Sequence, residues 1–175
     1  MRENSGFISF DQAEAGHIFD QANHKKYPLQ YYNVVNGKGL DRVDTKSSYY
    51  FYCYEGEIIL DRFDESGPLY ISTHMYASIS GDWALNPFAL GKAIVIRVFH
   101  ERGEYPKTKY RATHMVGGPI EKEGRLKYID GCTDSLLIPP VKMGDPCLNH
   151  LHFPSGIDQT PHTHPTHDRD WETLS

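Results

Sequence analysis

Short segments rich in aromatic and β-branched residues recur along this chain of 175 residues, and they constrain its fold more than any other feature. The clearest segment is Tyr49-Tyr-Phe-Tyr-Cys-Tyr54. The 12 tyrosines and 8 phenylalanines favour strands, while the 15 glycines and 11 prolines favour tight turns between them. Seven or more such segments, separated by turn signals, predict an all-β sandwich or barrel.

The predicted strands follow one another from Tyr31 onward. A turn at residues 55–57 is expected to separate the aromatic segment 49–54 from the next strand, 58–60. The other predicted strands are residues 69–73, 76–79, 93–99, 110–115, 126–128, 135–138 and 148–153. Residues 8–26 alone have a helical spacing of apolar positions, and they predict a short N-terminal helix.

Composition excludes several classes of function. The net charge of −5 gives no general attraction for nucleic acid. No apolar run reaches the length of a membrane span, and residues 1–6 lack the apolar core of a secretion signal. The three cysteines, Cys53, Cys132 and Cys147, show no C-x-x-C spacing and are expected to be reduced thiols. We therefore expect a cytoplasmic protein that binds neither nucleic acid nor membrane.

The most distinctive chemical feature is a histidine-rich segment, Gly156-Ile-Asp-Gln-Thr-Pro-His162-Thr-His164-Pro-Thr-His167-Asp168. Side chains at positions i and i+2 of a strand point to the same side, so His162 and His164 can share one metal ion. Neutral imidazole is the ligating form, and it is plentiful at neutral pH. This pair is the best candidate for a metal site in the sequence.

The third ligand is open between two residues. With Asp168, the set has two histidines and a carboxylate, which suits Fe(II), Mn(II) or Ni(II); with His167, three histidines suit Zn(II). Upstream, His150 and His152 share one face of the predicted strand 148–153 and could line the same cavity. The alternative is that the proline-flanked segment is exposed and binds no metal.

The residues from Gly156 to His164 resemble the first motif of the cupin superfamily, in which a glycine is followed by five residues and then His-x-His. Asp168 stands where the family has Glu. The second glycine of this motif is missing, as is the second motif with its histidine ligand. The resemblance therefore implies a metal site whose later part is absent from this sequence.

An earlier part of the chain resembles a cupin barrel that has lost its metal. Residues 54–60 resemble the turn that closes the first motif, but Tyr49 stands where the family has Glu. Where the family has His-x-His, this sequence has residues such as Arg-Val-Asp-Thr at positions 42–45. Residues 81–87 resemble the opening of the second motif, but Ala89 replaces its glycine and no histidine follows at the expected short spacing.

Taken together, the resemblance implies a two-barrel organisation with a jelly-roll fold. Its parts are an N-terminal helical segment (1–30), a degenerate barrel (31–116), a linker (117–127) and the opening strands of a truncated second unit (128–175). A truncated barrel would leave strand edges that pair across subunits, so a homo-oligomer such as a dimer is expected.

The resemblance implies a metal-dependent enzyme of the dioxygenase, isomerase or lyase type that acts on a small organic acid or sugar. Its cofactor would be a divalent metal, Fe, Mn, Ni or Zn, and no residue is assigned a catalytic role. Two alternatives stay open. One is a non-catalytic module for ligand binding or assembly, and the other is a fragment of a longer two-barrel protein.

Overall fold

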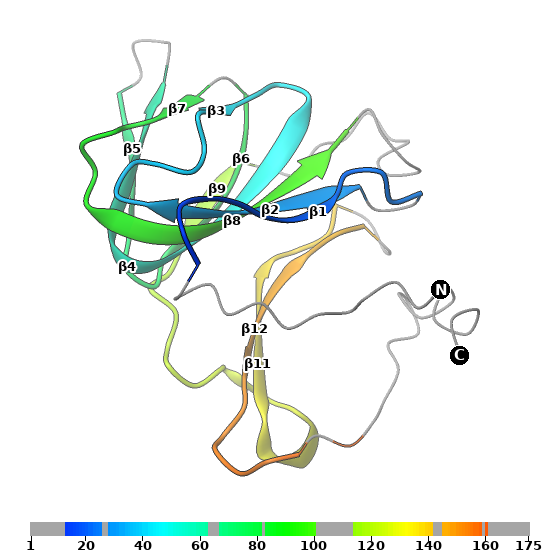
Figure 1. The fold of residues 1–175 in the computed structure, drawn as a ribbon. Helices are drawn as coiled ribbons and strands as arrows, with labels where there is room; N and C mark the ends of the chain where they lie inside the picture. Colours follow the sequence, from blue (N-terminus) through cyan, green and yellow to red (C-terminus); the bar gives the residue numbers. More distant parts are fainter. Residues whose placement is uncertain are drawn as a thin grey trace.

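The fold is built almost entirely from antiparallel strands (Figure 1). The computed structural model describes residues 13–25, 28–62, 67–81, 83–100, 114–141, 145–158 and 160. Residues 8–12 of the predicted helix and 110–113 of a predicted strand lie outside this part of the chain.

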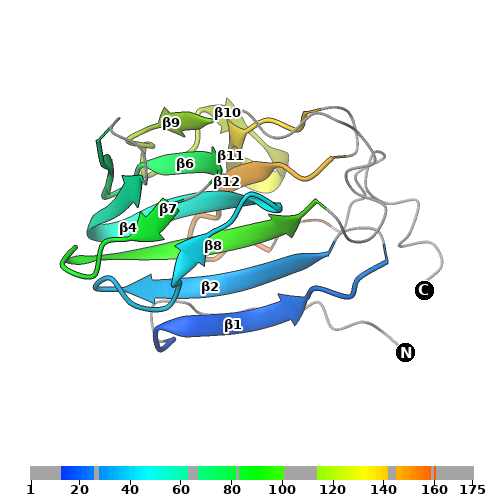
Figure 2. The same cartoon turned by 90° about the horizontal axis from the view of Figure 1, so that it is seen from above.

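Six strands lie side by side in a large sheet, in the order β1-β2-β8-β4-β6-β9 (Figure 2). All neighbouring pairs are antiparallel. Their bounds are β1 Gly16–Gln21, β2 Leu29–Val35, β4 Ser47–Arg62, β6 Tyr76–Ser80, β8 Gly91–Phe99 and β9 Met115–Gly117.

Strand β4 is long enough to join this sheet to a second, smaller layer. Its first part pairs with β6 and β8, and its last part pairs with β5 (Leu69–Ser72) and β7 (Trp83–Leu85). Strand β3 (Arg42–Val43) pairs with β7. The two layers enclose one apolar core, so the predicted all-β jelly roll is confirmed.

The turn predicted at residues 55–57 is wrong, because β4 continues through it. A bulge between Cys53 and Glu55 and a positive φ of 66° at Gly56 bend the strand instead of ending it. A Cβ atom at Gly56 would lie 2.2 Å from the carbonyl oxygen of Leu90, so only glycine fits this bend.

The main core fills the space between the two layers. Alternate residues of β8, such as Ala93 and Val95, are fully buried against Phe51 of β4 and Ile58 and Ile71 of the smaller layer. The buried members are Val34, Leu40, Val43, Tyr49, Phe51, Cys53, Ile58, Leu60, Ile71, Ala77, Ile79, Trp83, Leu85, Ala93 and Val95. The described interior of the barrel is therefore packed with apolar side chains.

The helix predicted over residues 8–26 is wrong for residues 16–21, which form strand β1. This strand pairs with β2, and the ring of His17 lies 5.3 Å from that of Tyr32 across the pair. Long-range pairing overrides a short helical spacing that Gly16 already interrupts. No helix in the described part of the chain is long and apolar enough to cross a membrane.

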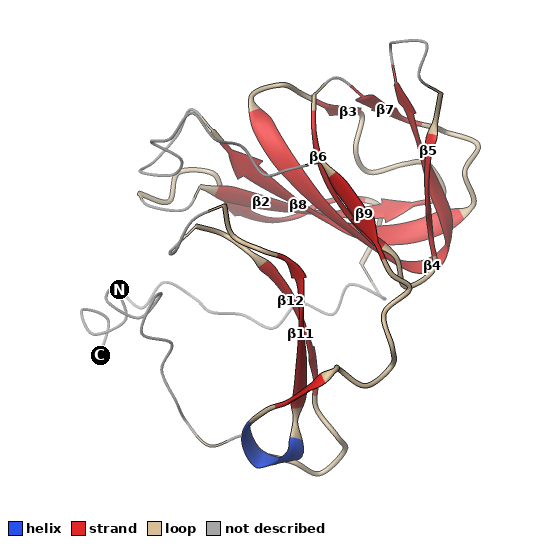
Figure 3. Cartoon of the chain, turned by 180° about the vertical axis from the view of Figure 1, so that it is seen from behind, coloured by secondary structure: helices blue, strands red, loops and turns tan. Residues whose placement is uncertain are grey.

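A separate three-stranded sheet packs on the outer face of the large sheet (Figures 1 and 3). It has the order β10-β11-β12, and a short 3-10 turn precedes β11. The bounds are β10 Leu126–Lys127, η1 Ile129–Gly131, β11 Thr133–Ile138 and β12 Leu148–His152. A second core of Tyr50, Val98, Leu137 and Ile138 joins the two sheets. The interpretation of residues 128–175 as part of a second cupin unit stays a prediction.

Candidate functional site

An ion pair occupies one end of the barrel. Arg97 and Tyr49 are in register across β8 and β4, near the pair Ser47–Phe99 that ends this ladder. The Arg97 guanidinium binds the Asp44 carboxylate, and its Nε donates to Ser47 Oγ at 2.9 Å. The guanidinium also lies 4.2 Å from the centre of the Phe99 ring. These contacts fix Arg97 between charged and aromatic partners.

Asp44 lies in the segment where the cupin resemblance would place metal ligands. Its carboxylate already accepts hydrogen bonds from Arg97 and, at 3.0 Å, from the Tyr49 hydroxyl. Burial raises the pKa of Tyr49, so the hydroxyl stays protonated and can donate. The positive charge that balances Asp44 is therefore a guanidinium, which makes this carboxylate a poor metal ligand.

The four predicted metal ligands, His162, His164, His167 and Asp168, lie outside the described residues. Within the described ranges, no group of three or more His, Cys, Asp or Glu side chains is placed to hold a metal ion. The donors of the described barrel thus do not fit a metal, and the site at His162 and His164 stays a prediction.

The three cysteines are free thiols, as predicted. Cys53 and Cys132 are buried, and Cys147 is half-buried. Burial raises the pKa of the Cys53 and Cys147 thiols, so both are held in the protonated, less reactive form.

Strand β12 places His150 and His152 on one face, as the sequence predicts, because they pair with Ser135 and Thr133 of β11. The Nδ1 atom of His150 is buried and has no hydrogen-bond partner among the described residues. Burial lowers the pKa of His150, and the neighbouring His152 and His74 lower it further, while Asp134 raises it. The sheet junction therefore holds a neutral imidazole.

This imidazole should make stability depend on pH. Because the pKa of His150 is lower in the native state than the ordinary value near 6.5, the unfolded chain takes up the proton first as the pH falls. The stability that neutral His150 contributes to the native state is fully present above pH ~6.5, and it is lost as the pH falls through the native pKa. We expect the free energy of unfolding in urea to fall less between pH 7 and pH 5.5 in His150→Gln than in the wild type. Equal losses would contradict this, and His17→Gln, at a more exposed histidine on β1, is the control.

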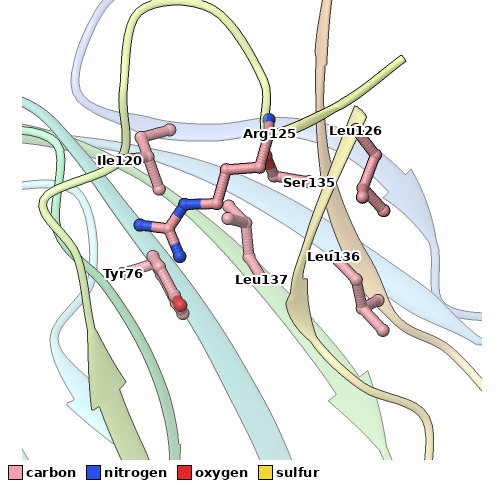
Figure 4. Close-up of a pocket in the computed structure, with 7 residues that line it drawn as sticks. All are labelled: Tyr76, Ile120, Arg125, Leu126, Ser135, Leu136 and Leu137. Carbon is pink, nitrogen blue, oxygen red and sulfur yellow. The ribbon is translucent and has the colours of Figure 1, made fainter. Parts of the chain in front are cut away.

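A cavity of about 270 Å³ lies where the large sheet, the segment 117–127 and the three-stranded sheet meet (Figure 4). Its apolar wall comes from leucines and an isoleucine, and its polar groups come from arginine, tyrosine and serine. The lining residues are Tyr76, Ile120, Arg125, Leu126, Ser135, Leu136 and Leu137. An apolar cavity with a few convergent polar groups is the usual form of a small-molecule site.

Arg125 extends over the cavity toward Tyr76 (Figure 4). Its backbone N–H donates to Ser135 Oγ at 2.9 Å, which ties the segment to β11. Its Nε donates to Glu121 Oε2 at 2.8 Å, and this hydrogen bond lowers the pKa of Glu121. The side chains of Arg125 and Glu121 are 63% and 58% exposed, so the pair is open to solvent.

Tyr76 reaches the cavity because it is paired with a glycine. Gly117 of β9 lies opposite Tyr76 of β6, and a Cβ atom there would lie 2.5 Å from both Cζ and the hydroxyl oxygen of Tyr76. Any larger residue at Gly117 would have to displace the ring. Neither residue, nor Arg125, was identified as a site residue from the sequence; the only signal was the charged and glycine-rich composition of residues 117–127.

No family model and no curated protein matches this sequence. Solved structures similar to the chain include a cupin family protein with a double-stranded β-helix fold from Methanocaldococcus jannaschii. It is 11% identical, with a TM-score of 0.41, and the match covers 57% of this chain and 94% of that one.

Two further similar structures are larger proteins. A protein described as glyoxylate-induced, from Pseudomonas aeruginosa, is 14% identical with a TM-score of 0.43, covering 68% of this chain and 46% of that one. A variant of oxalate decarboxylase from Bacillus subtilis is 12% identical with a TM-score of 0.37, covering 56% of this chain and 29% of that one. Each of these likenesses covers only part of this chain, and none of them gives a substrate.

Proposed function

We propose that this cupin-like protein binds a small molecule in the cavity between the large sheet and the three-stranded sheet. The cavity itself, with an apolar wall beside Arg125 and Tyr76, is the observation that carries the proposal. The inward side chains of the described barrel form the main core. The ion pair of Arg97 and Asp44 occupies the end of the barrel. The barrel then acts as a scaffold that presents one wall of the site.

Two exposed leucines provide the test. Leu136 lines the cavity and is 51% exposed, while Leu151 on the neighbouring strand is 44% exposed and does not line it. Because both are exposed, either can be enlarged with little effect on stability. We expect Leu136→Trp to fill the cavity and weaken the binding of a compact aromatic probe about tenfold or more.

The probes are benzoate and its neutral analogue benzamide, titrated calorimetrically and followed by methyl chemical shifts of Ile120 and Leu137. Leu151→Trp is the matched control and should bind both probes as the wild type does. The proposal fails if neither probe binds the wild type, or if Leu136→Trp binds them as tightly.

The second candidate is the metal-dependent enzyme implied by the cupin resemblance, with His162 and His164 as ligands and Asp168 or His167 as the third. The observation that favours it is the position of β12, which places His150 and His152 on one face upstream of these residues. In addition, the backbone N–H and hydroxyl of Thr160, two residues before His162, both donate to Asp130 Oδ2 at 2.6 Å. These bonds attach the chain just before the histidine segment to the 3-10 turn η1. A bound metal would act as a Lewis acid toward substrate oxygen. Metal analysis of the purified protein and of His162→Ala/His164→Ala distinguishes this candidate.

A further inference from the structure

The polar groups of the cavity select one class of ligand, on the premise that the cavity is the binding site. We propose that it takes a small monocarboxylic acid with a compact apolar body, and that Glu121, which binds Nε of the Arg125 guanidinium while the site is empty, competes with the ligand's carboxylate for this cation. Of the two ligand classes that the cupin resemblance implies, organic acids and sugars, this proposal selects the organic acid. It also makes Glu121 a competitor of the ligand for Arg125.

The apolar wall of the cavity disfavours a sugar as the ligand. A bound sugar presents many hydroxyl groups, and each one that is buried without a partner costs free energy. Of the lining side chains, only those of Tyr76, Arg125 and Ser135 are polar, and the Ser135 hydroxyl already accepts from the Arg125 backbone. The remaining wall is Ile120 with three leucines, which suits an apolar body.

The guanidinium of Arg125 favours a ligand with a carboxylate. A guanidinium presents five N–H donors in a planar fork that matches the two oxygens of a carboxylate. Only Nε of Arg125 takes part in a side-chain hydrogen bond with a described residue, which leaves its terminal nitrogens available. The ring of Tyr76 lies next to the Arg125 guanidinium in the same cavity (Figure 4). One negative group can therefore be held at this edge of the cavity.

Arg125 is presented from a fixed backbone. The N–H of Gly124 donates to Thr133 Oγ1 at 2.8 Å, and the N–H of Arg125 donates to Ser135 Oγ. These two bonds attach consecutive residues to alternate positions of β11. The backbone thus needs no rearrangement when a ligand binds, and only the side chains of Arg125 and Glu121 must move.

Glu121 is a competitor that a ligand can displace. It lies four residues before Arg125, and both side chains are more than half exposed, so water screens their attraction. A second carboxylate that entered beside Glu121 would be repelled by it unless Glu121 moved away. Removal of the charge of Glu121 should therefore strengthen the binding of an anion and leave a neutral analogue unaffected.

The experiment compares benzoate with benzamide by calorimetric titration of the full chain. We expect the wild type to bind benzoate several times more tightly than benzamide. Glu121→Gln should bind benzoate several times more tightly without a change for benzamide, and Arg125→Met should abolish the preference. Glu123→Gln and Lys122→Met lie in the same segment and are matched controls, expected to bind as the wild type.

The outcomes separate this inference from the proposed function. If both probes bind equally well to the wild type, or if Arg125→Met keeps the preference, the carboxylic acid assignment is overturned while the cavity remains a binding site. If Glu121→Gln binds benzoate no more tightly than Glu123→Gln does, the competitive role of Glu121 is overturned. If neither probe binds any variant, the proposed function itself fails.

Discussion

Replacement of Arg97 by methionine is expected to lower the free energy of unfolding by about 2 kcal/mol. The Arg97 and Asp44 side chains are only 23% and 33% exposed, so loss of the guanidinium would leave a largely desolvated carboxylate without its positive partner. The hydrogen bond to Ser47 and the contact with the Phe99 ring would be lost as well. Urea unfolding at pH 7 measures the change.

A double replacement separates the ion pair from simple packing. If the pair is the cause, Arg97→Met combined with Asp44→Asn should cost less than the sum of the two single changes, by about 1 kcal/mol. Additive losses would show that Arg97 acts through its contacts with Ser47 and Phe99 and not through the ion pair. A coupling of this size would show that the guanidinium stabilises the Asp44 carboxylate at this end of the barrel.

The strands of the barrel could be predicted from the sequence because they obey a simple period. In β8 alternate residues such as Ala93 and Val95 are buried, and in β12 of the three-stranded sheet half-buried and exposed residues alternate. The errors have a different origin. Strand β1 depends on its pairing with β2, and β4 passes through the predicted turn because Gly56 bends it without ending the ladder. Neither effect is encoded in the local spacing of apolar residues.

The candidate cavity could not be predicted, because its walls come from segments that lie far apart in the sequence. Tyr76 is on β6 of the large sheet, whereas Arg125 and Ser135 lie beyond β9. Before the fold is known, Arg125 is one more charge in a polar linker. The histidine segment at His162 is a far stronger local signal, because metal ligands close in sequence leave a recognisable spacing. Signals of this kind detect local sites and miss those that the tertiary fold assembles.

Ile138→Ala is expected to lower the free energy of unfolding by about 3 kcal/mol and to release the three-stranded sheet from the barrel. Ile138 is 1% exposed and belongs to the second core, with Tyr50 and Val98 of the large sheet on the other side. Since this core is small, loss of one large side chain removes much of what joins the two sheets. Amide hydrogen exchange should accelerate in β11 and β12 while β8 stays protected.

Ile71→Ala is the matched control, because Ile71 is fully buried in the main core instead. It should cost a similar free energy but raise exchange across the barrel. Release of the three-stranded sheet would also separate Tyr76 from Ser135 and Leu137, so Ile138→Ala should abolish the binding of benzoate under conditions in which the barrel remains folded. If the two variants raise exchange in the same strands, the sheets unfold as one unit. The cavity would then be a fixed part of a single core, with no separable junction for a ligand to stabilise.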